Sequence, residues 1–170
     1  IPLIAGVAMA DAITEQLTGR DVAVKWPNDV LVDGGKICGI LAEASDDAVI
    51  VGAGVNTAMT GEQLPVPSAT SFAVLGAVAD EDRLLADYLD RLDELSGMLS
   101  ASGDPIAGGV HAAATAKSAT LGREVEVTLP GGRMLAGTAV ALDDEGRLVV
   151  EVDARREAVS AGDVVHARRL

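Results

Sequence analysis

The chain has 170 residues, 49% of them hydrophobic, which is enough for one medium domain or a medium domain with a small one attached. Its formal net charge of −13 repels phosphate backbones, and one Trp, one Tyr and one Phe provide no platform for stacking bases, so we expect no nucleic-acid partner. The apolar runs are shorter than the roughly 20 residues that span a bilayer, which argues against a membrane protein, and the single Cys38 favours a reducing, cytoplasmic compartment.

The first half of the sequence predicts a helix followed by a meander of strands. Apolar residues recur at helical spacing over residues 2–18, with Pro2 suited to the first turn and Gly19 to the position after the end. Asp33-Gly34-Gly35 is a hairpin signal. The expected strands are 22–24, 30–32, 36–43 and 48–56, with a turn at 45–47. A helix followed by an antiparallel meander indicates an α+β fold.

The second half predicts two more helices and then a small β domain. Residues 57–69 have the composition of a loop, and the acidic residues 80–82 suit the start of a helix. Leucines at core spacing continue that helix: Leu85, Leu89, Leu92, Leu95 and Leu99. A shorter helix is expected over 106–117. Strands are expected at 124–129, 134–142, 148–152, 158–159 and 164–167, and they predict a small barrel. We therefore predict two domains, 1–119 and 120–170.

The corner formed by Trp26, Pro27, Asn28 and Asp29 is unusual, because the chain contains only one Trp and six Pro. Pro27 fixes its own backbone angle and favours an extended conformation at Trp26, so the corner is stiff. A stiff corner can aim the amide of Asn28 and the carboxylate of Asp29 at a bound group. The alternative interpretation of Asp29 is a turn-capping carboxylate.

Lys36 and three glycines on neighbouring predicted strands indicate a binding groove. A lysine that follows two glycines at a strand start can reach a phosphate or carboxylate, although most lysines are solvated surface charges. Gly39, Gly52 and Gly54 would leave open space where side chains otherwise lie, unless they are simple packing positions. Asn56 ends the last of these strands with an amide.

Several common catalytic patterns do not occur in the sequence. Gly52-Ala53-Gly54 lacks the third glycine of a dinucleotide fingerprint, and the residues around Lys36 do not form a P-loop. No His/Cys cluster has the spacing of a metal site, so no metal ligands are predicted. His111 and His166 stand alone in the sequence, and we expect both to be structural or surface residues.

The sequence resembles a known family, the biotin–protein ligases. Three blocks carry the resemblance: Lys-Trp-Pro-Asn-Asp-Val at 25–30, Gly-Lys-Ile-Cys-Gly-Ile-Leu-Ala-Glu at 35–43 and Val-Gly-Ala-Gly-Val-Asn at 51–56. Ala-Thr-Ser-Phe at 69–72 is a weaker fourth block, and the β domain that opens with Leu-Gly-Arg at 121–123 resembles the family's C-terminal domain. The resemblance implies part of a mixed sheet with helices, like that of class II aminoacyl-tRNA synthetases, followed by a small SH3-like β-barrel.

The resemblance also implies a reaction and a site. Biotin and ATP would form biotinyl-5′-adenylate, and the biotinyl group would pass to a lysine of a biotin carboxyl carrier domain in a biotin-dependent carboxylase. Mg²⁺ would accompany ATP. Lys36 and Asp29 match the family's catalytic positions. The positions that match the biotin pocket are Lys36, Gly39, Leu41, Gly52 and Gly54, and those that match the adenylate side are Trp26, Asn28 and Asn56.

One geometric condition follows from this assignment. Strict alternation along a strand puts Lys36 on the face opposite to Gly39 and Leu41. All three can face biotin only if a β-bulge lies between Lys36 and Gly39. We therefore predict a bulge at this point.

The sequence departs from the family's pattern in one respect. The family has an Arg- and Gly-rich loop ahead of the first helix, and no Gly-Arg-Gly-Arg run occurs in this chain. The chain thus resembles the C-terminal two-thirds of a ligase, and we expect it by itself to bind biotin poorly and to turn over slowly or not at all. The alternatives are a non-catalytic remnant or ligand-binding module of the same fold, or a lipoate-type ligase, against which the Trp-Pro-Asn-Asp block argues. The sequence does not indicate an oligomeric state.

Overall fold

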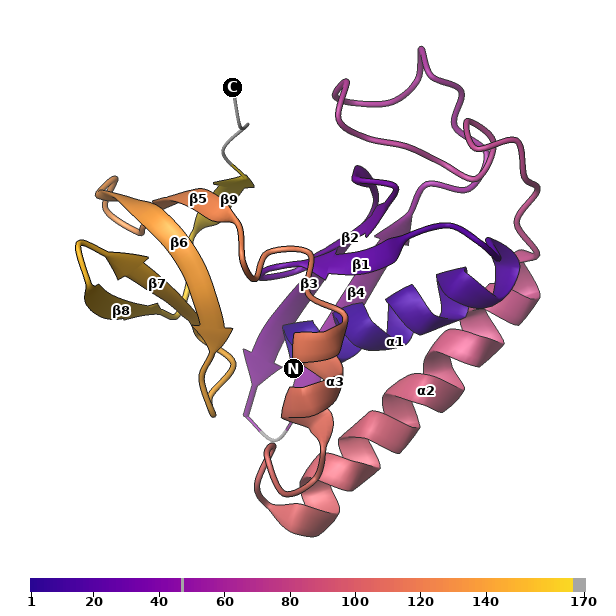
Figure 1. Ribbon diagram of the computed structural model, residues 1–170. Coiled ribbons are helices and arrows are strands. Elements are labelled where there is room, and N and C mark those ends of the chain that lie inside the picture. Colours follow the sequence, from indigo (N-terminus) through magenta and orange to yellow (C-terminus); the bar gives the residue numbers. More distant parts are fainter. Residues whose placement is uncertain (47, 167–170) are drawn as a thin grey trace.

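The computed structural model describes residues 1–46 and 48–166 (Figure 1). Asp47 and Ala167, which end a predicted turn and a predicted strand, lie outside this description. The described residues form three helices and nine strands, in the order α1 (Pro2–Gln16), β1 (Val22–Lys25), β2 (Asp29–Val32), β3 (Gly35–Ser45), β4 (Ala48–Val55), α2 (Glu81–Ser102), α3 (Val110–Ala116), β5 (Glu124–Thr128), β6 (Met134–Leu142), β7 (Leu148–Val152), β8 (Arg155–Val159) and β9 (Asp163–His166).

The first sheet has the strand order β1-β2-β3-β4, and each strand pairs antiparallel with the next. The predicted hairpin is present, because Asp33 and Gly34 both adopt positive φ angles, 49° and 81°, between β2 and β3. Parallel pairing in the described residues is limited to two isolated bridges, Val24 with Ser118 and Lys36 with Ala69. The predicted α+β class is confirmed.

Helix α1 is the central layer, between the first sheet and α2 (Figure 1). It is buried on both sides, and its core residues run from Ile4 to Ile13 with few interruptions. Gly6 allows the helix to approach the sheet, since a Cβ atom there would lie 3.1 Å from Cγ1 of Val24. No helix of the described residues packs on the other face of the first sheet.

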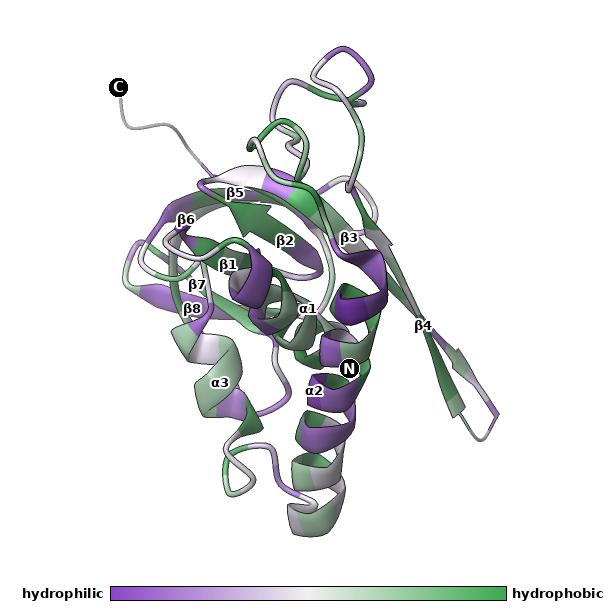
Figure 2. Ribbon diagram, turned by 90° about the vertical axis from the view of Figure 1, so that its right-hand side faces the viewer, coloured by the Kyte–Doolittle hydropathy of each residue, from purple (hydrophilic) through white to green (hydrophobic). Residues whose placement is uncertain are grey.

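Helix α2 covers α1 from outside. Asp80 caps its N-terminus by accepting a hydrogen bond from the backbone N–H of Arg83, at 3.1 Å. The buried positions are Leu84, Tyr88 and Leu95, with Leu92 and Leu99 partly buried. The expectation that Leu85 and Leu89 face the core is wrong, because their side chains are 57% and 50% exposed. In this first part of the helix the buried positions lie one residue earlier, at Leu84 and Tyr88, whereas the predicted Leu92, Leu95 and Leu99 do pack on the core. Figure 2 shows the mixture of hydrophobic and hydrophilic positions along α2.

The second sheet is a five-stranded antiparallel unit with the order β8-β7-β6-β5-β9. Its interior contains Val125, Val127, Leu148, Val150 and Val164, which alternate with exposed residues along their strands. The strands predicted from the sequence are all present within the described residues. The predicted helix over 106–117 is shorter than expected and begins only at residue 110.

The two sheets share one continuous hydrophobic core. The segment between α3 and β5 pairs with β1, since the N–H of Val24 donates to the C=O of Lys117 at 2.7 Å and the N–H of Ala119 donates to the C=O of Val24 at 2.8 Å. The turn between β6 and β7 reaches the first helix, because a Cβ atom on Gly146 would lie 3.1 Å from Leu3. No helix in the described part of the chain is long and apolar enough to cross a membrane.

Candidate active site

Lys36 and Asp29 form an ion pair at the helix-free face of the first sheet. The Nζ atom of Lys36 lies 2.5 Å from Oδ1 of Asp29, and the two side chains are 43% and 18% exposed. A Cβ atom placed on Gly39 would lie 3.4 Å from the same Nζ atom. The ammonium group therefore lies over Gly39, within reach of anything that binds on this face.

The predicted bulge in β3 places Lys36 there and is confirmed. Val30 pairs with Cys38 and Leu31 pairs with Lys36, so Ile37 is the extra residue on β3. Ile37 and Cys38 are both buried, at 0% and 1% exposure. The bulge turns Lys36 to the same side as Gly39, as a regular ladder would not.

The glycines form an uncovered floor beside the ion pair. Gly39 pairs with Gly54, and Leu41 pairs with Gly52, so the four residues lie on one face of the β3–β4 hairpin. A Cβ atom on Gly52 or Gly54 would meet no heavy atom within 4 Å. Leu41 is 63% exposed and supplies an apolar side chain at the end of this floor. The structure thus brings together the six residues predicted for catalysis and biotin binding.

Asn28 and Asn56 lie at the rims of this face and bond to backbone groups. Nδ2 of Asn28 donates to the C=O of Ile40 at 2.6 Å, and the N–H of Ile40 donates to the C=O of Asn28 at 2.9 Å. Nδ2 of Asn56 donates to the C=O of Thr70 at 2.9 Å. Both amides therefore hold neighbouring segments in place through Nδ2, and each also has a side-chain oxygen, Oδ1, that can accept a further hydrogen bond.

The segment after β4 is fastened beside Lys36. The N–H of Lys36 donates to the C=O of Ser68 at 2.9 Å, and the N–H of Thr70 donates to the C=O of Lys36 at 2.8 Å. This segment forms the long loop at one end of the first sheet (Figure 1). A hollow of about 530 Å³ lies at its start and is lined by Val55, Asn56, Thr57, Ala58, Met59 and Gln63. The sequence marked residues 69–72 only as a weak block, and their pairing with Lys36 had no sequence signal.

Trp26 lies in the junction between the two sheets and not on the open face. Its side chain is 3% exposed. Its backbone N–H donates to Oγ1 of Thr120 at 3.0 Å, and its indole Nε1–H donates to the C=O of Gly146 at 3.1 Å. The peptide bond between Trp26 and Pro27 is cis. Thr120 and Gly146 are contacts that sequence reasoning missed.

The other titratable groups near the site are not poised for nucleophilic chemistry. Burial raises the pKa of the Cys38 thiol to about 12, a shift that Asp29 reinforces and Lys36 opposes, so this thiol is protonated at neutral pH. His111 and His166 bond within the junction, His111 Nε2 to the C=O of Leu142 at 2.9 Å and His166 Nε2 to Oγ1 of Thr120 at 3.2 Å. Among the described residues, no group of three or more His, Cys, Asp or Glu side chains is arranged around a common metal position.

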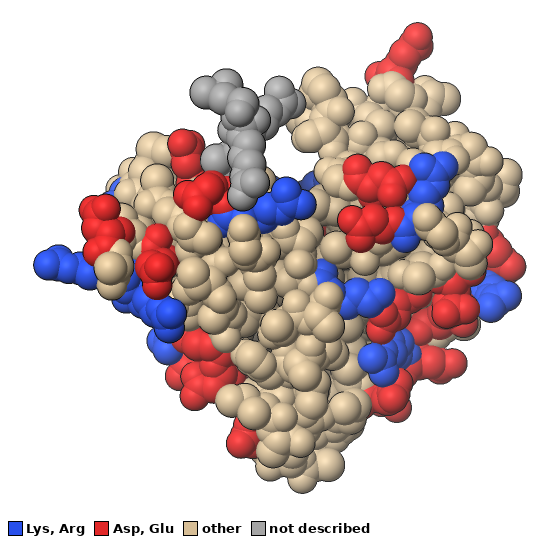
Figure 3. Space-filling view, viewed as in Figure 1, with Lys and Arg blue, Asp and Glu red and all other residues tan. Residues whose placement is uncertain are grey.

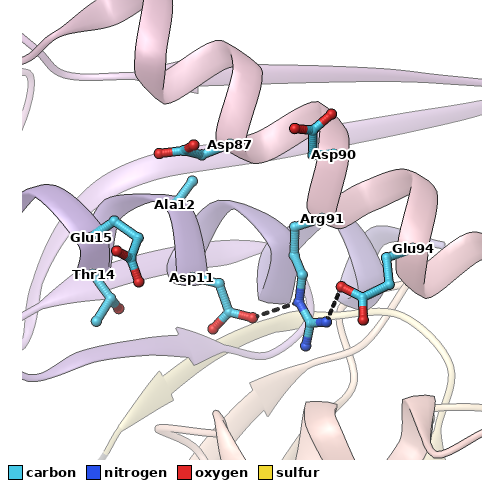
Figure 4. Close-up of a pocket in the computed structure, with 8 residues that line it drawn as sticks. All are labelled: Asp11, Ala12, Thr14, Glu15, Asp87, Asp90, Arg91 and Glu94. Atoms are coloured by element: carbon cyan, nitrogen blue, oxygen red, sulfur yellow. Dashed lines mark hydrogen bonds and ion pairs between the residues drawn. The ribbon is translucent and has the colours of Figure 1, made fainter.

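A second hollow, of about 440 Å³, lies between α1 and α2 and is lined mainly by acidic residues (Figure 4). Its one basic residue, Arg91, is paired inside it, with Nε 2.9 Å from Oδ2 of Asp11 and Nη1 2.6 Å from Oε2 of Glu94. On the molecular surface in Figure 3, many basic side chains also lie next to acidic ones. The hollow belongs to the helical layer and shares no residue with the open sheet face, so we do not assign it to the candidate site.

The fold and this group of residues define a class of protein: an α+β enzyme-like domain with a glycine-floored sheet face, a lysine–carboxylate pair at its edge, and a small β domain packed against it. Comparisons with known sequences agree. Residues 3–56 match the family described as biotin/lipoate A/B protein ligase, and residues 120–167 match the biotin protein ligase C-terminal domain.

Two relatives are named biotin–[acetyl-CoA-carboxylase] ligase. The one from Mycobacterium tuberculosis is 39% identical over 170 residues, which are 99% of this chain and 62% of the relative. The one from Paracoccus denitrificans is 30% identical over 172 residues, which cover 96% of this chain and 71% of the relative. The solved biotin protein ligase of Aquifex aeolicus in complex with biotin and ATP superposes with a TM-score of 0.79 at 25% identity, over 99% of this chain and 71% of that one.

The chain therefore belongs to the biotin–protein ligase family, as the sequence blocks indicated. Its second sheet is the C-terminal domain of that family, which confirms the expected small β domain. The chain spans about three fifths of the length of its Mycobacterium tuberculosis relative.

Proposed function

We propose that the full-length protein is an ATP-dependent biotin–protein ligase that attaches biotin to a lysine of a biotin carboxyl carrier domain. The relatives named biotin–[acetyl-CoA-carboxylase] ligase support this activity, and so does the likeness to a ligase that binds biotin and ATP. The observation that carries the proposal is the Lys36–Asp29 pair, 2.5 Å apart at the edge of an uncovered glycine floor.

The open face suits biotin in shape and polarity. Gly52 and Gly54 let a flat ring approach the sheet, because no heavy atom lies within 4 Å of either Cβ position, and Gly39 leaves room for the Lys36 ammonium beside it. Leu41 offers apolar contact to the aliphatic part of biotin. Lys36, at the edge of the floor, is placed for the carboxylate at the end of the ligand.

Lys36 and Asp29 have distinct roles in the proposed reaction. In the first step a biotin carboxylate oxygen attacks the α-phosphorus of ATP, and pyrophosphate leaves. The Lys36 ammonium stabilises the negative charge on the carboxylate and phosphoryl oxygens. In the second step the acceptor lysine amine attacks the acyl carbon and AMP leaves; Asp29 orients the amine and takes up its proton.

The remaining assignments concern the nucleotide and the partners. Asn28 and Asn56 contact the adenylate through their side-chain oxygens, while Nδ2 of each stays bonded to the backbone, and Trp26 holds the adjoining corner. Mg²⁺ accompanies ATP, and Asp29 is the carboxylate that the site offers it, in keeping with the preference of this ion for one or two carboxylates together with substrate phosphates. Residues 1–119 form the catalytic part and 120–170 the C-terminal part. We place the reaction in the cytoplasm, with a carboxylase carrier domain as partner.

Replacement of Lys36 by Ala in the full-length protein tests the proposal. We expect biotin-dependent pyrophosphate release to fall by about 10²–10³-fold, the usual cost of removing one charge-stabilising donor. Lys117→Ala is a matched control, because Lys117 also pairs with an aspartate, Asp11 at 2.8 Å, but in the helical layer. We expect that control to retain its rate.

The alternatives predict other outcomes of the same measurement. Unchanged adenylate formation in the Lys36 variant would show that Lys36 does not stabilise the charge that develops in the first step. Biotin binding without pyrophosphate release by the wild-type protein would indicate a ligand-binding module, and adenylation of lipoate in preference to biotin would indicate a lipoate-type ligase.

A further inference from the structure

We propose that Trp26 is a positioning residue. It holds the second sheet (β5–β9, called the C-terminal sheet below) against the first sheet and, through the Trp26–Asp29 corner, fixes the Lys36–Asp29 pair. The inference rests on the proposed ligase function for its kinetic consequences. In this role Trp26 acts through its contacts with the C-terminal sheet, which are separate from the adenylate contact assigned to it above.

Trp26 anchors the C-terminal sheet through its side chain. The indole N–H of Trp26 donates to the C=O of Gly146, in the turn between β6 and β7, at 3.1 Å. Gly146 adopts a φ angle of 77°, which lets this turn press against Leu3 of α1. A ring that is 3% exposed and whose one polar atom is used is held in a single orientation.

Thr120 forms the second anchor at the same residue. Its hydroxyl is fully buried and accepts the backbone N–H of Trp26 at 3.0 Å. The same oxygen lies 3.2 Å from Nε2 of His166 on β9. Trp26 is thus bonded to the entry of the C-terminal sheet through its backbone and to the β6–β7 turn through its side chain.

The residues after Trp26 connect this anchor to the reacting groups. Asn28, two residues after Trp26, is bonded to Ile40 by both its side chain and its backbone carbonyl, at 2.6 and 2.9 Å. Asp29 follows directly, lies opposite Gly39 in the ladder and holds Lys36. The corner is therefore fixed at both ends, and a displacement of Trp26 is transmitted to the carboxylate three residues away.

A second contact to the same turn provides a matched control. His111 on α3 bonds through Nε2 to the C=O of Leu142, at the end of β6, at 2.9 Å. This contact also holds the C-terminal sheet, but it does not involve the corner. Loosening the sheet through His111 is expected to leave the Lys36–Asp29 pair in place, and loosening it through Trp26 is expected to displace the pair.

The experiment compares Trp26→Phe with His111→Phe in the full-length protein. Phe keeps an aromatic ring in the junction and removes the N–H donor. We expect Trp26→Phe to lower kcat for pyrophosphate release by about tenfold with KM for biotin within about twofold, since small misplacements of reacting groups reduce rates strongly. His111→Phe should leave kcat within about twofold of wild type. A loss of kcat in both variants, or in neither, would overturn the inference.

A double-mutant cycle separates positioning from general destabilisation. In an Asp29→Asn background the pair is already broken, so Trp26→Phe should cause little further loss of kcat. A second tenfold loss there would show that Trp26 acts independently of the pair and would contradict the proposal. If Trp26→Phe does not fold, Thr120→Val removes the second anchor and takes its place in the same cycle.

Hydrogen exchange supplies a readout that does not depend on activity. The N–H of Ile40 donates to the C=O of Asn28, so it reports on the corner directly. We expect this amide to exchange faster in Trp26→Phe and at the wild-type rate in His111→Phe. Unchanged exchange in the Trp26 variant would refute the positioning role, whereas faster exchange in a protein without ligase activity would refute only the proposed function.

Discussion

Gly54 and Ala53 are neighbours on β4 whose side-chain positions lie on opposite faces of the first sheet. Gly54 belongs to the open floor, and its Cβ position is free of neighbours. We predict that Gly54→Val lowers the biotin affinity of the full-length protein at least tenfold, because the isopropyl group occupies the space above the floor. The free energy of unfolding should stay the same or rise by up to about 1 kcal/mol, since valine suits a strand better than glycine does. Calorimetric titration and urea unfolding measure the two effects.

Ala53→Val is the matched control for this prediction. It adds two methyl groups to the same exposed strand, one residue away, on the face opposite to the floor. We expect biotin affinity to remain at the wild-type value. Equal losses in both variants would mean that the strand is disturbed as a whole, and no loss in Gly54→Val would exclude Gly54 from the biotin pocket.

At the residue scale, the sequence predicted the charged pair and the glycines of the site but not the backbone contacts around them. Lys36, Asp29 and the three glycines were found from the sequence because a stiff corner and unusual strand glycines leave a local signal. The partner of the Trp26 indole is a backbone carbonyl at position 146, and a carbonyl has no residue-type signal. Leu85 and Leu89 were misplaced because the residues before them, Leu84 and Tyr88, are also apolar, so the start of α2 offers two candidate stripes one residue apart.

At the scale of elements, the bulge in β3 was predictable because the site residues assigned to this strand could not otherwise lie on one face. A strand that presents both Lys36 and Gly39 to one face requires one extra residue between them, and Ile37 is that residue. The attachment of the segment after β4 was not predictable in the same way. It depends on hydrogen bonds between backbone groups of Lys36, Ser68 and Thr70, which any residues at these positions can form.

Strand β9 contributes a pH-dependent element to the junction. Burial lowers the pKa of His166, and the nearby positive charges of Lys25 and Arg123 lower it further. The folded chain therefore binds this proton less readily than the unfolded chain. The contribution of His166 to stability is present above the unfolded pKa of about 6.5, and it declines as the pH falls through that value toward the folded pKa.

We predict that the free energy of unfolding decreases between about pH 7.5 and 5.5, a range in which most carboxylates stay ionised. Urea unfolding at several pH values in this range measures the change. In His166→Gln the decrease should be smaller, because glutamine keeps a polar group near Thr120 but does not titrate. An identical pH dependence in both proteins would show that His166 does not contribute.

At the scale of the whole molecule, the boundary between the two proposed domains passes through a packed interior. Buried residues from α1, both sheets and α3 belong to one hydrophobic cluster, although no described strand of one sheet pairs with a strand of the other. The sequence predicted two units from a change in element type near residue 120, and composition gave no sign that they share a core. Their shared core explains why the residue that marks the corner of the site is also the residue that holds the second sheet.

This arrangement predicts that the two sheets unfold together. Trp26 is the only tryptophan of the chain and lies in the junction, so its fluorescence reports the contact between the sheets. The helices of the described residues all end by residue 116, so far-ultraviolet circular dichroism mainly reports the helical part that contains the first sheet. Because the core is continuous, we expect both signals to change in one coincident transition in urea. A fluorescence change at lower urea concentration than the helical signal would mean that the junction opens first, and Trp26 would then be too weakly held to position Asp29 from the C-terminal sheet.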